Sequence, residues 1–190
     1  MTNFDFLLSE PQFASFANVA VSAENLFKID CAAATLNCRR ALEFAVKWMY
    51  SADKELEVPD DERLSSLIDN ENFRKIVDSD VLFRMERIKD CGNAAAHDEK
   101  GVTEKIAERC IKDLFYIMDY IAYCYADEYE QTEFNDKLLE LTTEEALAFV
   151  TEENPDFKKL LDENKKMKEM LTKKRIKYQK DYKKRDFRKY

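Results

Sequence analysis

His97 is the only histidine of the chain, and its side chain is the one most suited to acid–base chemistry. An imidazole titrates near neutral pH and can move a proton to or from a reacting group. His97 follows Gly92, Asn93 and three alanines, and the preceding stretch from Asp80 to Cys91 has the apolar spacing of a helix. Because glycine adopts a positive φ at a helix end without steric cost, we expect this helix to stop at Gly92. The pattern therefore predicts a turn that positions His97, either as a functional group or as a capping or packing residue.

Five cysteines supply thiols, but they form no recognisable metal or disulfide pattern. Their number is odd, no C-x-x-C pair occurs, and a single histidine leaves little to complete a metal site. Cys31 and Cys38 lie seven positions apart, on one face of a predicted helix, as packing requires. We expect reduced cysteines that are mostly buried as small apolar side chains, and we expect neither a metal nor a cofactor.

A second arrangement imitates a metal-dependent nuclease. Pro155-Asp156 followed by Glu163-Asn164-Lys165 reads like a PD…ExK pattern. In such nucleases the acids and the lysine stand on strands that converge on a metal. Here the whole stretch is predicted to be helical, which places Asp156 and Glu163 roughly 10 Å apart along the axis, so we interpret the match as coincidence. The sequence also lacks a G-x-x-x-x-G-K-[ST] phosphate loop and any recognisable serine or cysteine nucleophile.

The C-terminal segment, 158–190, has a charge opposite to that of the rest of the chain. It contains fifteen Lys and Arg against five Asp and Glu, so its net charge is +10, whereas residues 1–157 carry −18. Aromatic residues are interleaved with the cations, which makes both phosphate contacts and stacking surfaces available. The segment is predicted to be either a solvated linker or an arm that binds nucleic acid non-specifically. The candidate contacts to nucleic acid are its basic residues Lys173, Lys174, Arg175, Lys177, Lys180, Lys183, Lys184 and Arg185.

The composition predicts an all-α protein. Of its 190 residues 37% are charged, only two are glycine and three are proline, which favours helices throughout. We expect a helical bundle domain over 1–130, a short helical connector over 131–157, and a long basic C-terminal helix or linker over 158–190. Because no run of eighteen apolar residues occurs and the N-terminus lacks the features of a signal peptide, a cytoplasmic protein without membrane contact is predicted.

Capping signals and apolar spacing predict the helices that must position the candidate residues. Asp30 is the expected N-cap of the longest early helix, and Thr103 opens a long amphipathic helix near the end of the bundle. The aromatic residues of this last helix fit the core and its rim better than a platform for nucleobases. The expected elements are one or two helices between Pro11 and Phe27, then helices over 31–52, 64–68, 73–77, 80–91 and 103–125.

Two segments resemble the signatures of one known family. Residues 88–97, I-K-D-C-G-N-A-A-A-H, resemble an I-R-x-x-G-N-x-A-A-H signature, and residues 39–50 resemble an R-x-A-L-E-x-x-V helix. Both signatures belong to a helical domain often found at the N-terminus of type I restriction enzyme R subunits, which is grouped with the HEPN superfamily of helical bundles. The two segments occur in the family's order, and the resemblance spans roughly 13–125. In such a HEPN-like bundle the motif turn would consist of Lys89, Gly92, Asn93 and His97.

The resemblance also implies a possible reaction. In the family picture, HEPN ribonucleases cleave RNA without a metal through an Arg-x(4–6)-His motif, in which the arginine holds the phosphate and the histidine moves a proton. Here the arginine would have to occupy position 90, 91 or 92, which hold Asp90, Cys91 and Gly92, so the motif is broken and no catalytic residues are expected. One of the two neighbouring arginines of the early helix is expected to pair with a surface acid, and the other to point toward the histidine turn. If the protein were a ribonuclease, the set implied by the resemblance would be His97, Asn93, Lys89, Arg39 and Arg40.

The first hypothesis is a non-catalytic recognition or assembly domain of a type I restriction enzyme R subunit, which acts in DNA restriction and defence against foreign DNA. The 190 residues would then be the N-terminal piece of an ATP-dependent endonuclease. Its partners would be other restriction-complex subunits or downstream motor domains, with DNA or RNA bound by the basic tail, and a homodimer is also compatible. The alternatives are a stand-alone, metal-independent HEPN-type endoribonuclease and a small nucleic-acid-binding protein that acts through its basic tail.

Overall fold

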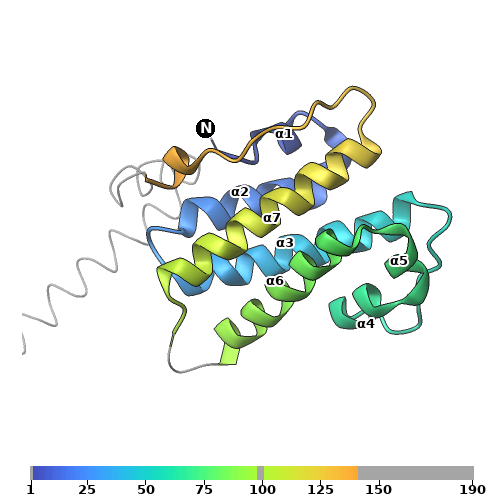
Figure 1. Ribbon diagram of the computed structural model, residues 1–190, viewed down its shortest axis with the longest axis horizontal. Helices are drawn as coiled ribbons and strands as arrows, with labels where there is room; N and C mark the ends of the chain where they lie inside the picture. The colour runs from blue at the N-terminus through green and yellow to red at the C-terminus, as the bar shows by residue number, and fades with distance from the viewer. Residues whose placement is uncertain (1, 98–100, 141–190) are drawn as a thin grey trace, which may run out of the picture. The chain divides into compact units, whose positions relative to one another are not determined.

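The computed structural model describes residues 2–97 and 101–140, and within these ranges the protein is all-α, as predicted. The long helices are α2, α3, α6 and α7, and the short α4 and α5 lie near the N-terminal end of α6 (Figure 1). The elements are α1 (Asp5–Leu8), η1 (Pro11–Phe13), α2 (Ala14–Leu26), α3 (Cys31–Ala52), α4 (Leu64–Asp69), α5 (Glu71–Ile76), α6 (Ser79–His97), α7 (Glu104–Tyr125) and η2 (Asp136–Glu140), where η denotes a 3-10 helix.

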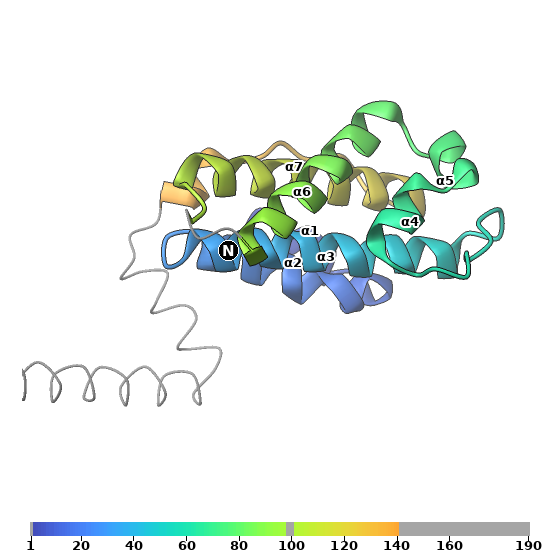
Figure 2. The same ribbon diagram turned by 90° about the horizontal axis from the view of Figure 1, so that it is seen from below.

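Helix α3 occupies the centre of the bundle, where it contacts α2, α6 and α7 (Figure 2). The Asp30 side chain accepts hydrogen bonds from the backbone N–H groups of Ala32 and Ala33 at 2.9 and 3.0 Å, which confirms its role as the N-cap. The face of α3 that its three neighbours cover is fully buried, and it includes Leu42 and Val46. The fold therefore assembles around the helix whose cap and apolar spacing are clearest in the sequence.

The N-terminal segment packs on α3 through aromatic rings. Between Pro11 and Phe27 the chain forms η1 and one continuous helix, α2, rather than two helices. Phe13 and Phe16 lie against the Trp48 ring of α3, with ring centroids 5.1 and 5.8 Å apart. Such edge-on aromatic pairs contribute about 1 kcal/mol each beyond the area that they bury, so this cluster holds α2 firmly on α3.

Helix α7 begins at the predicted cap, where the Thr103 hydroxyl accepts a hydrogen bond from the backbone N–H of Ile106. One side of α7 is apolar and buried against α3 and α6. Phe115 is buried, whereas Tyr116 and Tyr123 are exposed. The aromatic residues of this helix thus divide between the core and its rim, as predicted.

The expectation that a helix ends at Gly92 is wrong. Helix α6 continues through Gly92 to His97, and among the residues that the structure describes only Gly101 has a positive φ, of 73°. The glycine is required for a different reason. A Cβ atom at Gly92 would lie only 2.5 Å from the Cβ of Arg39 and 2.6 Å from its Cδ. Gly92 therefore permits the close approach of α6 to α3 and makes no turn.

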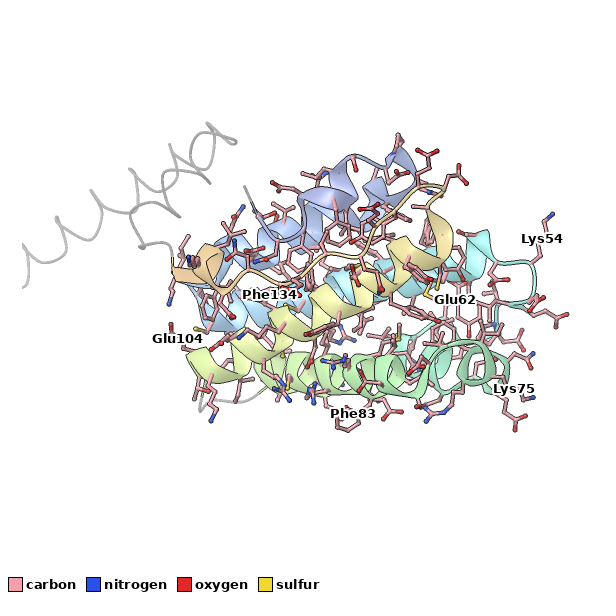
Figure 3. The ribbon with its side chains drawn as sticks, turned by 45° about the horizontal axis from the view of Figure 1, so that its top comes forward. Lys54, Glu62, Lys75, Phe83, Glu104 and Phe134 are labelled. Carbon is pink, nitrogen blue, oxygen red and sulfur yellow. The ribbon has the colours of Figure 1, made fainter. Side chains whose placement is uncertain are left out.

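The chain returns along the bundle after α7, over residues 126–140. The Asp119 carboxylate accepts hydrogen bonds from the Tyr129 hydroxyl at 2.7 Å and from the Thr132 backbone N–H at 3.1 Å. Phe134, labelled in Figure 3, lies on this segment. Its ring packs edge-on against that of Phe115, with centroids 5.3 Å apart. The first ten residues of the predicted connector, 131–140, thus lie on the bundle, and the rest of the connector and the basic tail lie outside the described residues.

The cysteines differ more in burial than predicted. Cys38 and Cys110 are fully buried, and burial raises the pKa of both thiols well above the usual range, so both are neutral thiols. Cys31 and Cys91 are half-buried and Cys124 is exposed, so burial is complete for two of the five cysteines. Within the described ranges no helix is both long enough and apolar enough to cross a membrane.

Candidate functional site

Residues 39–50 and 88–97, the two segments that resemble the family signatures, contact each other at Arg39 and Gly92. Arg39 lies on α3, and its aliphatic stem packs against the backbone of α6 at Gly92. Its Nη1 lies 3.8 Å from the Glu43 carboxylate, and Glu43 is also paired with Lys47 at 3.0 Å. The Nε of Arg39 is buried and has no hydrogen-bond partner among the described residues. Arg39 thus has an ion pair near the surface and also lies beside α6, whereas the sequence analysis assigned these two positions to different arginines.

Arg40, Lys89 and Asn93 of the predicted set do not form one constellation with Arg39. Arg40 is exposed and lies over the Phe44 ring, 5.6 Å from its centroid. Lys89 is half-buried, and its Nζ lies 3.6 Å from the adjacent Asp90 carboxylate. Asn93 is exposed, and His97 is the last residue of α6. Across the described ranges, no hydrogen bond or ion pair joins Arg39 or Arg40 to Lys89 or Asn93. The predicted nucleic-acid contacts between Lys173 and Arg185 lie beyond the described residues.

A different set of side chains surrounds a cleft of about 540 Å³ between α6 and α7, here called the cationic cleft. Four of its residues are basic and one is acidic, and two apolar side chains complete its wall. The residues that line it are Arg87, Cys91, Lys105, Ile106, Glu108, Arg109 and Lys112. The side of α6 that faces this cleft does not carry Lys89, because two helical positions correspond to a rotation of roughly 200° from Arg87.

A buried carboxylate fixes the α6 wall of the cleft. Asp113 of α7 is fully buried, and it accepts hydrogen bonds from Arg84 at 3.0 Å and from both Nε and Nη2 of Arg87. These hydrogen bonds raise the pKa of Arg87, so its guanidinium stays charged. Arg84 is also paired with Asp80 at 2.9 Å, and the bidentate contact of Arg87 with Asp113 determines the orientation of the Arg87 guanidinium.

The remaining cations of the cleft come from one stripe of α7. Lys105, Arg109 and Lys112 recur at four- and three-residue intervals, so they lie on one side of the helix. Lys112 is paired with Glu108 at 2.8 Å and with Asp136 at 2.6 Å. Lys105 and Arg109 are exposed and have no ion-pair partner within the part of the chain that the structure describes. Among the described residues, the cleft therefore presents at least two uncompensated positive charges to the solvent.

This arrangement can bind an anion with several oxygens. A guanidinium held by a buried acid and two unpaired cations on the facing helix match the oxygens of a phosphate group. In the ranges that the structure covers, no group of three or more His, Cys, Asp or Glu side chains has the arrangement of a metal site.

The sequence analysis did not identify this cleft. The spacing of the three α7 cations is visible in the sequence and could have indicated a basic stripe, since they lie on the polar side of an amphipathic helix. The pairing of Arg84 and Arg87 with Asp113 could not be anticipated, because an acid within an apolar helix face has no local signal for its partner.

One family model matches the chain, that of DUF4145, described as a domain of unknown function, and it covers residues 21–169. No curated protein and no solved structure matches. The matched range is more than half of the chain, and it includes both family-like segments and both walls of the cationic cleft. On this evidence the protein belongs to the DUF4145 family.

Proposed function

We propose that this domain recognises nucleic acid through the cationic cleft, without catalytic activity of its own, as the N-terminal part of a cytoplasmic type I restriction enzyme R subunit. The observation that carries the proposal is the pair of uncompensated cations, Lys105 and Arg109, beside the fixed guanidinium of Arg87. The restriction setting rests on the resemblance of residues 39–50 and 88–97 to the signatures of that domain.

The negative charge of the bundle limits the places where a nucleic acid could bind. Residues 1–157 carry a net charge of −18, which repels polyanions from most of the bundle surface. A nucleic acid would therefore be attracted only where cations are concentrated, and the cleft is such a place within the bundle. Because phosphate contacts of this kind are largely independent of base sequence, the cleft would supply affinity rather than sequence selectivity.

We propose that the domain is not catalytic because the positions of the ribonuclease motif do not hold the arginine that the motif requires. Where the ribonuclease pattern requires an arginine, the chain has Asp90, Cys91 and Gly92, and Gly92 is packed against Arg39. Arg87 is engaged by Asp113. Other restriction-complex subunits or a motor domain would then be the partners of this domain.

The test compares two charge reversals of equal size in the full chain. Fluorescence anisotropy would measure the affinity for a labelled DNA strand over a series of salt concentrations. We expect Lys105→Glu with Arg109→Glu to weaken binding at least tenfold and to reduce the slope of log K against log salt by roughly 1.5, since two phosphate contacts are lost. The matched control, Lys183→Glu with Lys184→Glu in the basic tail, is expected to have the smaller effect.

Two results would overturn this proposal. One is the absence of DNA binding by the unaltered protein, and the other is a cleft variant that binds as tightly as the unaltered protein while the tail variant loses affinity. The second result would support the small nucleic-acid-binding protein that acts through its tail. Circular dichroism and a melting curve of each variant establish that the fold is intact.

A ribonuclease is a second candidate, and one observation favours it. Because α6 is continuous to His97, no helix end separates that histidine from the basic residues Arg87 and Lys89. Incubation of the purified full chain with single-stranded RNA, in the presence of a metal chelator, tests this activity. Cleavage that His97→Ala abolishes would establish the ribonuclease, and cleavage that survives His97→Ala, or no cleavage at all, would exclude a role for His97.

A further inference from the structure

We infer that the nucleic acid bound by the cationic cleft is single-stranded, and that its bases stack on the exposed rings of Phe83 and Tyr116 beside the cleft. This inference rests on the proposed function and goes further, because it specifies the form of nucleic acid and the residues that discriminate it. The two rings, Phe83 and Tyr116, are here called the stacking pair, and each is contacted by one arginine.

The stacking pair combines exposure with fixed geometry. Phe83 is 58% exposed and Tyr116 is 49% exposed, although both are large aromatic residues. The Arg87 guanidinium carbon lies 4.9 Å from the Phe83 ring centroid, and that of Arg84 lies 4.3 Å from the Tyr116 centroid. Figure 3 shows Phe83 projecting outward from α6. Each ring is therefore supported by a cation on one side and accessible from solvent.

The arginines are themselves held in place. Arg84 and Arg87 both donate to the buried carboxylate of Asp113, and Arg84 also donates to Asp80 at 2.9 Å. Two side chains that usually lose much rotamer freedom on binding are thus already ordered, which lowers the entropic cost of binding a ligand.

The stacking pair lies beside the cationic cleft. Tyr116 continues the stripe of Lys105, Arg109 and Lys112 on α7, and the stripe extends for roughly 16 Å along the helix axis. Arg87 belongs to both sites, since it lines the cleft and contacts the Phe83 ring. A strand whose phosphates follow the cleft would therefore bring its next bases over these rings.

This arrangement favours an unpaired strand. In a duplex the base faces are covered by neighbouring base pairs, so only the phosphates could use the site. In a single strand the bases can leave their own stack, and stacking on aromatic or guanidinium planes then adds affinity with little dependence on base identity. The stacking pair would thus make the domain prefer single-stranded over double-stranded DNA.

The experiment measures the affinity of the full chain for an oligo-dT strand and for a duplex, both of about 15 nucleotides, by anisotropy. We expect Phe83→Ala and Tyr116→Ala each to weaken binding of the single strand by roughly tenfold and to leave binding of the duplex unchanged. Phe44→Ala is the matched control, because Phe44 also carries an arginine, Arg40, but lies on α3 beside a separate cavity. It is expected to leave both affinities unchanged.

The outcomes separate this inference from the proposed function. If charge reversal at Lys105 and Arg109 weakens binding of both DNA forms but Phe83→Ala and Tyr116→Ala bind the single strand normally, the stacking role is wrong and the cleft proposal stands. Equal losses on strand and duplex in the aromatic variants would also overturn the stacking role. If the charge reversal has no effect on either DNA form, the proposed function itself fails.

Discussion

At the scale of the residue, Asp113 has the most demanding environment in the bundle. Its carboxylate has no exposed surface and accepts hydrogen bonds from Arg84 and Arg87, whose side chains are 22% and 24% exposed. A buried charge is tolerated only while its partners remain, because each group loses its hydration on folding. Removing the acid takes away the carboxylate that pairs with Arg87 and leaves Arg84 only its pair with the exposed Asp80.

We therefore predict that Asp113→Asn lowers the free energy of unfolding by about 3 kcal/mol, measured by urea denaturation. Asp136→Asn is the control, since Asp136 is exposed and also pairs with a cation of the cleft, Lys112. Its effect should be below about 1 kcal/mol, as for other exposed ion pairs. If Asp113→Asn lowers the free energy of unfolding as little as Asp136→Asn does, the Asp113 cluster does not stabilise the fold.

At the scale of the element, the packing of α6 on α3 depends on one missing side chain. Gly92 lies within α6, where glycine normally lowers helix stability by about 1 kcal/mol relative to alanine. A larger residue does not fit here, because the Arg39 Cβ would lie 2.5 Å from any Cβ at this position. The near end of a side chain cannot rotate away, so the two helices would have to separate.

Gly92→Ala is accordingly expected to destabilise the protein by about 1–2 kcal/mol, since overpacking outweighs the gain in helix propensity. The midpoint of urea denaturation measures this effect. Asn93→Ala, at an exposed position of the same helix, should leave stability unchanged or raise it slightly. A Gly92→Ala variant more stable than the unaltered protein would contradict the close approach of α6 to α3.

At the scale of the whole molecule, Asn3 joins three distant parts of the chain. Its backbone N–H and its side-chain amide donate to the Glu24 carboxylate of α2 at 2.9 and 2.8 Å. Its side-chain oxygen accepts from the Asn135 backbone N–H at 2.7 Å. The N-terminal segment, α2 and the returning segment 126–140 are thus connected through the buried Asn3, which the Glu24 carboxylate holds in place.

Burial raises the pKa of Glu24 from its ordinary 4.5 to about 7, although the hydrogen bonds from Asn3 oppose this rise. The folded protein therefore holds this proton more tightly than the unfolded chain does. The stability that Glu24 contributes is complete below pH 4.5 and is lost as the pH rises to about 7. Between pH 8 and pH 5 the difference in unfolding free energy between the unaltered protein and Glu24→Gln should shift by roughly 2–3 kcal/mol in favour of the unaltered protein.

Urea denaturation of both proteins at several pH values measures this shift, and the comparison removes the contributions of all other carboxylates. Glu24→Gln also disturbs a hydrogen bond to Asn3, but that loss is independent of pH and changes only the offset between the two curves. Parallel curves would mean that Glu24 titrates normally in the folded protein.

The sequence by itself determined the all-α fold and most of the helix boundaries. Asp30, Thr103 and the apolar spacing of α3 and α7 act through contacts within about four residues, so their signals are local and can be recognised in the linear chain. The cap at Asp30 and the end of α3 at Ala52 are confirmed for this reason. The resemblance of residues 39–50 and 88–97 to one family's signatures was also a property of the sequence alone.

Only the tertiary structure decided the packing role of Gly92, the partners of Asp113 and the cleft in which the cations of α7 lie. Glycine serves equally for a positive φ and for a close helix approach, and the choice here depends on Arg39, which lies 53 positions earlier in the chain. The cationic cleft likewise requires α6 and α7 to lie side by side, and the buried Asp113 to hold Arg84 and Arg87. Local periodicity encodes which face of a helix is buried, but the partner of a buried charge is set by the packing of distant segments.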